Sequence, residues 1–196
     1  MKKQILILAL AIAMCAMGLA QAFAEDAFAP TAYVQIDIEN YGTIVAELYG
    51  NEAPITVENF LKLVNEGFYD GLTFHRIISG FMIQGGDPLG NGTGGSGETI
   101  RGEFAQNGVE NNIAHTRGTL SMARTNDPNS ATSQFFIMHE AAPHLDGGYA
   151  AFGRVISGIE VVDAICDATP VTDNNGSVSK ENQPVITTIT QIDKPE

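Results

Sequence analysis

The chain has 196 residues, a length that favours one folded domain with a substantial core. Its formal net charge is −13, which argues against nucleic acid and anionic lipid as partners. Only 17% of the residues are charged and 21 are glycine, so we expect many tight turns and few exposed helices.

The first residues predict a secretory signal peptide. Two lysines after the initial methionine precede the uncharged run 4–24, and Ala22-Phe23-Ala24 has the small-x-small pattern of a cleavage site. We therefore expect residues 1–24 to be removed. Residues 25–196 would then form the mature domain, exported to the periplasm or the cell exterior.

Two alternatives for the leader stay open. The apolar core, residues 5–20, could remain as a membrane anchor, although its 16 residues fall short of the roughly 20 needed to span a bilayer. Cys15 could carry a lipid, although Met14 stands before it where such sites usually have a small side chain. Either case would keep the protein at the membrane.

Cys15 and Cys166 are the only two cysteines. Removal of the leader leaves Cys166 alone, so we expect no intramolecular disulfide. Residues 161–166 have the pattern of the apolar side of a helix, which predicts a buried, unreactive thiol.

The chain opens with an expected hairpin and a helix. Residues 33–39 alternate apolar and polar side chains, and a turn at 40–42 leads to a second strand at 43–48. Pro54 then begins an amphipathic helix that Gly67 ends.

The remaining elements are mostly short strands. Residues 158–166 have helical spacing, and we expect one further helix there. The glycine-rich loop 85–97 matches G-x-G-x-x-G, but no helix follows it and no βαβ unit surrounds it, so a nucleotide site is rejected. Many short strands with two helices favour a closed β architecture. The expected strands are 74–84 (broken at Ser79-Gly80), 119–123, 133–138, 150–155 and 185–192.

The run 74–87 carries the most chemistry. It is rich in aromatic and β-branched residues, yet it contains the cation Arg76 and the amide of Gln84. Regular alternation of faces would place Phe74 and Arg76 on the same side of the strand. The run 133–138 repeats the mixture of apolar bulk with one amide. Such a set predicts a site for an uncharged, partly apolar ligand that carries one or two carbonyl groups.

Other kinds of site find less support. The four histidines have no metal-ligand spacing, and neither Ser121 nor Ser133 lies in a G-x-S-x-G motif. A two-carboxylate glycosidase site stays open, because acidic residues are plentiful, but no pair stands out. We expect no metal and no cofactor.

Several motifs, in order along the chain, resemble those of cyclophilin-type peptidyl-prolyl isomerases over about residues 32–193. They are Phe74-His75-Arg76-Ile77-Ile78, Phe81-Met82-Ile83-Gln84-Gly85-Gly86-Asp87, and residues 90–95, 120–123, 133–137 and 152–155. The resemblance implies a mainly β fold, a closed eight-stranded antiparallel barrel capped by an α-helix at each end. It also implies catalysis of X-Pro isomerisation during the folding of exported proteins. The expected partners are proline-containing, unfolded polypeptides, and the expected state is a monomer.

The resemblance also assigns the site. Arg76 matches the catalytic arginine, Gln84 matches the residue that holds the substrate carbonyl and orients the arginine, and Phe81 completes the catalytic set. The residues expected to bind substrate are Met82, Ala123, Arg124, Gln134, Phe136, His144, Leu145 and Tyr149.

Four positions depart from the family pattern. Arg124 stands where many relatives have Asn, and Tyr149 where many eukaryotic relatives have His. Ser79 is often Pro in the family. His144 replaces the Trp of drug-sensitive relatives, so we expect only weak binding of cyclosporin. A rival hypothesis is a cyclophilin-like module that binds proline segments without useful turnover, and an isomerase assay decides between the two.

Overall fold

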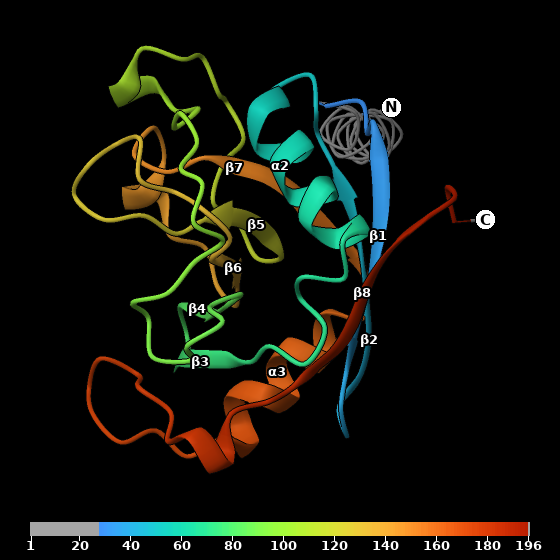
Figure 1. Cartoon of the computed structure of the whole chain (residues 1–196), viewed down its shortest axis with the longest axis vertical. Helices are drawn as coiled ribbons and strands as arrows, with labels where there is room; N and C mark the ends of the chain where they lie inside the picture. The colour runs from blue at the N-terminus through green and yellow to red at the C-terminus, as the bar shows by residue number, and fades with distance from the viewer. Residues whose placement is uncertain (1–27, 196) are drawn as a thin grey trace, which may run out of the picture.

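A computed structural model describes residues 28–195 and shows a mainly β protein with eight strands and two α-helices (Figure 1). The leader expected at residues 1–24 lies outside the described residues. Within 28–195 no helix has the length and apolar character needed to cross a membrane. The strands are β1 (Ala32–Ile38), β2 (Gly42–Leu48), β3 (Phe74–Ile78), β4 (Met82–Gly85), β5 (Thr119–Met122), β6 (Phe135–Met138), β7 (Ala151–Ser157) and β8 (Ile186–Ile192). The helices are α2 (Pro54–Asn65), α3 (Ile159–Ala168) and the 3₁₀ turns η1 (Ala105–Asn107), η2 (Pro143–Leu145) and η3 (Lys180–Asn182).

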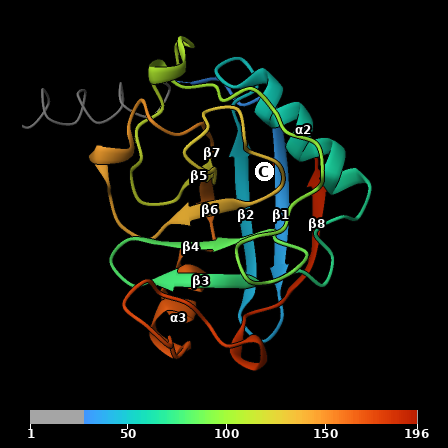
Figure 2. The same cartoon turned by 60° about the vertical axis from the view of Figure 1, so that its left-hand side comes forward.

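The eight strands form one antiparallel sheet in the order β3-β4-β6-β5-β7-β2-β1-β8. The sheet curls round on itself, so that β3 and β8 both border the same interior in Figure 2. The expected strands and both helices are confirmed, with bounds that differ by a few residues.

The prediction of a fully closed barrel was wrong. Strands β3 and β8 remain the two ends of the sheet. In the described part of the chain they are joined only at their starts, by the isolated bridge between Thr73 and Val185 and by a few backbone hydrogen bonds around it. Pro184 is one reason why the barrel does not close. Its carbonyl accepts from the Phe74 N–H (3.0 Å), but proline has no N–H that could donate back to Phe74. The result is a curled half-barrel whose seam is joined by loop backbone.

Local sequence explains the first hairpin and the helix that follows it. Buried and half-buried residues alternate along β1, and Asn40 takes the left-handed conformation (φ 64°) that the turn to β2 needs. Pro54 occupies the first turn of α2, as predicted. The carboxylate of Glu103 accepts from the free N–H groups of Ile55 (3.1 Å) and Thr56 (2.8 Å), so a distant residue completes this helix start.

The main core lies inside the curl of the sheet. Phe60 of α2 contacts Phe135 and Phe152 of the sheet, with ring centroids 5.4 and 5.1 Å apart. Helices α2 and α3 lie at opposite ends of the sheet (Figure 1). Cys166 of α3 is only half-buried, and burial together with Asp163 and Asp167 raises the pKa of its thiol to about 12. The expectation of full burial was wrong, but the raised pKa agrees with an unreactive thiol.

A bulge in β3 overturns the expected alternation of faces. Phe74 pairs with Gly85 and Arg76 pairs with Gln84, so His75 is an extra residue on its strand. Phe74 is therefore buried in the main core, while Arg76 faces the opposite side of the sheet. Because of the bulge, Phe74 and Arg76 lie on opposite faces of the sheet, although they are only two positions apart.

Candidate active site

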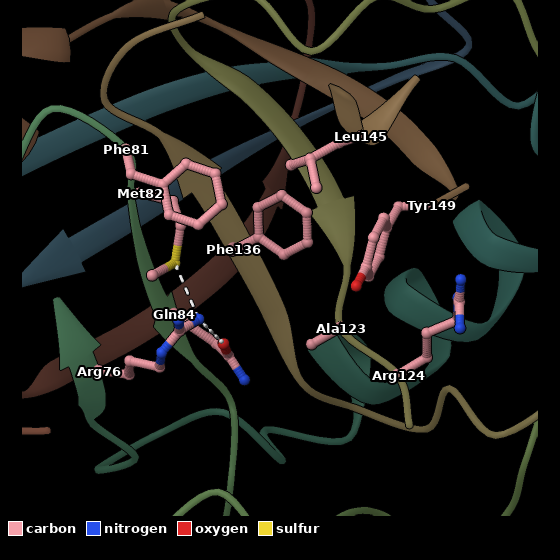
Figure 3. A pocket seen from close by; sticks show the side chains of 9 residues that line it. All are labelled: Arg76, Phe81, Met82, Gln84, Ala123, Arg124, Phe136, Leu145 and Tyr149. Atoms are coloured by element: carbon pink, nitrogen blue, oxygen red, sulfur yellow. Dashed lines mark hydrogen bonds between the residues drawn. The ribbon is translucent and has the colours of Figure 1, made fainter. Parts of the chain in front are cut away.

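A cavity of about 220 Å³ opens on the outer side of strands β3, β4 and β6. Side chains from β3, from β4 and the turn before it, from β6, from the end of β5 and from the η2 region surround it (Figure 3). The lining consists of Arg76, Phe81, Met82, Gln84, Ala123, Arg124, Phe136, Leu145 and Tyr149.

One end of the cavity is apolar. Met82, Phe136 and Leu145 are buried in a small hydrophobic cluster that is separate from the main core, and Phe81 and Tyr149 pack against it. The ring of Phe136 meets that of Tyr149 edge-on, with centroids 6.0 Å apart. These side chains form an apolar cup of a size suited to a small ring.

The other end is polar and ordered by a relay of amides. Arg76 Nη1 donates to Gln84 Oε1 (3.3 Å), Gln84 Nε2 donates to Gln134 Oε1 (2.9 Å), and Gln134 Nε2 donates to the carbonyl of Gly94 (2.7 Å). Each amide is therefore fixed by a partner on both sides. The relay leaves the guanidinium facing the apolar cup, with Met82 Sδ 3.9 Å from Nη1 (Figure 3).

Asn175 also holds Arg76, and the sequence analysis missed it. Arg76 Nε donates to the Asn175 carbonyl (2.8 Å), and Nη2 donates to Asn175 Oδ1 (3.3 Å). The Asp173 carboxylate fixes this loop by accepting from the N–H groups of Asn175 and Ser177. Burial lowers the pKa of the Arg76 guanidinium, while Tyr149 and Asp173 partly offset that effect. The motif Asp173-Asn-Asn-Gly176 signals a turn, but nothing local in it points to Arg76.

A buried chain of hydrogen bonds lies beneath Phe136. His115 Nδ1 is 2.9 Å from Asp146 Oδ1, and its Nε2 is 3.0 Å from Ser121 Oγ. Burial lowers the pKa of His115, although the Asp146 carboxylate raises it in part, so the ring is neutral at pH 7. Ser121 is fully buried (0% exposed), so this serine, histidine and aspartate cannot reach a substrate as a hydrolase would require. The His115 ring stacks on Phe136 at 6.0 Å and supports the cup from below.

Arg124 stacks between two aromatic rings. Its guanidinium carbon lies 5.0 Å from the Phe104 ring and 4.6 Å from the Tyr149 ring. Its Nε and Nη2 donate to the carbonyl of Gly148 at 3.0 and 2.7 Å. The side chain is therefore fixed, and its charge lies at the wall of the cavity.

The structure brings together all eleven predicted site residues. Nine line the cavity itself, as given above. Gln134 lies one step behind Gln84 in the amide relay, and His144 stacks on Phe81 at the rim, with ring centroids 5.8 Å apart and planes at 25°. Between residues 28 and 195 no group of three or more His, Cys, Asp or Glu side chains is arranged to hold a metal ion.

Comparison with known proteins agrees with this geometry. Residues 33–191 match the family model described as cyclophilin type peptidyl-prolyl cis-trans isomerase/CLD. Peptidyl-prolyl cis-trans isomerase B of Bacillus subtilis is 49% identical over 144 residues, which cover 74% of this chain and 92% of that protein. A peptidyl-prolyl cis-trans isomerase of Helicobacter pylori is 46% identical over 143 residues, covering 72% and 84%.

A solved structure shows the same fold. The cyclophilin type peptidyl-prolyl cis-trans isomerase of Cryptosporidium parvum superposes with a TM-score of 0.73 at 34% identity, covering 84% of this chain and 99% of that one. The same protein has been crystallised in the presence of the dipeptide Ala-Pro. The curled antiparallel sheet, the arginine beside an apolar cup and these matches lead to one conclusion: the chain belongs to the cyclophilin-type peptidyl-prolyl cis-trans isomerases.

Proposed function

We propose that this isomerase accelerates rotation about X-Pro bonds in exported polypeptides by binding the twisted amide more tightly than the planar one. The observation that carries the proposal is the position of Arg76, whose guanidinium faces an apolar cup of ring size. In this reading Phe81, Met82, Phe136 and Leu145 hold the proline ring, which is the group that Ala-Pro would place there.

Rotation about an X-Pro bond is opposed by amide resonance, with a barrier of roughly 18–20 kcal/mol. At the twisted transition state the prolyl nitrogen loses conjugation and becomes a hydrogen-bond acceptor. A donor aimed at that nitrogen stabilises the transition state and not the ground state, which lowers the barrier. No acid, base or nucleophile is needed.

Arg76 is suited to this role because its charge persists and its donors are fixed. The guanidinium has five N–H groups. Three of them are occupied by Gln84 and Asn175, and these bonds orient the plane of the group. A fourth N–H, on Nη1, is directed at the weak acceptor Met82 Sδ (3.9 Å), so a substrate acceptor has the remaining Nη2 N–H and would replace the sulfur at Nη1. In the proposal Gln84 also holds the carbonyl of the residue before proline, which lies along Ala123, Arg124 and Gln134.

One charge-assisted hydrogen bond contributes on the order of 1.5–3 kcal/mol. A million-fold acceleration needs about 8 kcal/mol, so Arg76 cannot act alone. The apolar cup supplies the remainder by stripping water from the amide, because the planar, dipolar form loses more hydration than the twisted form. Tyr149 and His144 line the rim of the same cup in this proposal.

The test is an isomerase assay on proline peptides with the mature chain. We expect Arg76→Ala to lose about 10- to 150-fold in kcat/KM, the equivalent of about 1.5–3 kcal/mol, with an unchanged circular dichroism spectrum. Arg76→Lys is the matched control and should recover only part of the activity, since a lysine keeps the charge but not the fork of donors. If the wild-type chain binds proline peptides without turnover, the protein is a binding module instead.

We also propose that the substrates are unfolded exported proteins and that residues 25–196 form the mature, monomeric protein. Support comes from the sequence of residues 1–24, with its basic start, apolar run and Ala22-Phe23-Ala24. N-terminal sequencing of protein from the native host should begin at Glu25. A mature chain that starts at Met1, or that carries lipid on Cys15, contradicts this part of the proposal.

A further inference from the structure

Two larger cavities adjoin the active-site cavity, one on each side of Gln84. The first, of about 550 Å³, shares Gln84, Ala123 and Arg124 with it. The second, of about 580 Å³, shares Arg76 and Gln84 with it and extends to Lys180; we name it the Lys180 cavity. The three cavities form one groove in which Gln84 lies at the centre.

The lining of this groove has an unusual charge balance for so acidic a protein. It includes three cations, Arg76, Arg124 and Lys180, and no aspartate or glutamate. In the part of the chain that the structure describes, none of these cations has a carboxylate oxygen within 4.0 Å. The whole chain has a net charge of −13. Among the described residues five cations lack a carboxylate partner, and three of the five line this groove, the other two being Arg101 and Lys194.

Two carboxylates that act on residues of the groove, Asp87 on His75 and Asp173 on Arg76, are engaged by backbone N–H groups. Asp87 is 1% exposed and accepts from the backbone N–H groups of Leu89, Asn91 and Gly92. Asp173 accepts from the N–H groups of its own turn. Both offset part of the positive field, but neither lines the groove. At physiological salt the Debye length is about 8 Å, so the remote negative charges are screened more than the three cations in contact with a ligand.

A buried histidine forms part of the wall of the Lys180 cavity. His75 is 6% exposed, and neither of its ring nitrogens has a hydrogen-bond partner among the described residues. Its Nε2 lies beside Gly92, which also lines this cavity. Burial lowers the pKa of His75, so the ring is neutral and carries one N–H donor. Both ring nitrogens are themselves buried from solvent, so His75 forms part of the cavity wall, and a carboxylate bound in the cavity would meet the charges of Arg76 and Lys180.

We propose that the Lys180 cavity makes this isomerase selective for segments in which an acidic residue follows the proline. The inference rests on the proposed function, in which the residue before proline lies along Ala123 and Gln134. In this proposal the chain after proline leaves the cup past Arg76, into the cavity that shares Arg76 and Gln84 with it and extends to Lys180. Its carboxylate is the chemical group that Arg76 and Lys180 would bind.

The first experiment compares three proline peptides that differ only in the residue after proline, which is Glu, Gln or Lys. Magnetisation-exchange NMR measures the isomerisation rate of each with the mature enzyme. We expect kcat/KM for the Glu peptide to exceed that for Gln by about threefold and that for Lys by about tenfold. In 1 M NaCl, where the Debye length is about 3 Å, the differences should largely disappear.

The second experiment locates the effect. Lys180→Glu should bring the Glu-to-Lys ratio close to one or invert it. Lys194→Glu makes the same charge change at an exposed lysine near the C-terminus and should keep the wild-type ratio. The imidazole signal of His75 should shift on binding the Glu peptide more than on binding the Gln peptide.

The outcomes separate the two hypotheses. If no peptide is isomerised, the proposed function fails. If all three are isomerised at equal rates, the function stands and the charge selectivity is overturned. A Glu preference that survives unchanged in Lys180→Glu overturns the assignment to the Lys180 cavity.

Discussion

Asn175 holds Arg76 through two hydrogen bonds, although the two residues lie 99 positions apart in the chain. The Asn175 carbonyl accepts from Nε at 2.8 Å, and its side-chain oxygen accepts from Nη2 at 3.3 Å. Gln84 engages the other side of the guanidinium at Nη1. The plane of the arginine is thus set from two directions before any substrate arrives.

Removal of the Asn175 side chain should therefore lower turnover without removing the charge. We expect Asn175→Ala to reduce kcat about fivefold, the equivalent of about 1 kcal/mol, with a smaller change in KM. The reason is that Arg76 is less well oriented in the variant, while the apolar cup that binds the proline ring is unchanged. The matched control is Asn174→Ala, an exposed neighbour in the same loop, which should behave as wild type. Equal losses in both variants would mean that loop disruption, and not the bond to Arg76, causes the effect.

The pH dependence of turnover should be nearly flat between about pH 6 and 9. Burial lowers the pKa of Arg76, but its ordinary value is about 12.5, so the group stays charged across this range. The proposed mechanism transfers no proton, so no second group limits the rate. Steady-state kcat/KM measured at half-unit intervals checks this. A bell-shaped profile would contradict transition-state binding by Arg76 as the whole mechanism.

Stability should fall when the pH drops below about 6.5. Burial lowers the pKa of both His75 and His115 in the folded protein, so the unfolded chain binds more protons in this range. The free energy of unfolding then decreases as the pH falls from the unfolded pKa toward the folded one, by up to about 1.4 kcal/mol per pH unit for each histidine.

Urea unfolding between pH 7.5 and 5 measures that slope. His75→Gln should make the slope shallower, whatever it does to stability at pH 7.5, because one buried titrating group is gone. The carboxylates with lowered pKa values, Asp87, Asp173 and Glu181, act only below this window, since acids lose their contribution as the pH falls through their folded pKa. An unchanged slope in the variant would show that His75 is not held neutral.

Binding of cyclosporin should be weak and should improve in His144→Trp. His144 stacks on Phe81 at the rim, so a larger ring at this position would extend the apolar wall. An indole N–H bond contributes about 0.5–1.5 kcal/mol, and its larger face about 1–2 kcal/mol more. Together they correspond to about 30- to 150-fold in affinity. The observed gain should be smaller, because the imidazole of His144 already contributes part of this binding free energy. Inhibition constants for both chains test this, and equal constants would refute it, while turnover of proline peptides should change far less.

The sequence by itself determined the elements and most of the site. Three local patterns predicted elements without any knowledge of tertiary contacts. They are the alternation along residues 33–48, the proline that starts α2 and the break at Ser79-Gly80. The motif resemblance placed eleven site residues together because each motif lies on a strand or a turn whose neighbours are set by the family fold.

Only the tertiary structure decided the features that depend on distant contacts. The bulge at His75 exists because β4 and the core fix both flanking residues, and a single strand carries no sign of its pairing register. The seam between β3 and β8 is joined where the Phe74 N–H donates to the Pro184 carbonyl, across 110 positions of chain. Asn175 reaches Arg76 over a similar separation. These long-range contacts form only when the whole sheet has curled. The residues next to each partner in the sequence therefore cannot predict them.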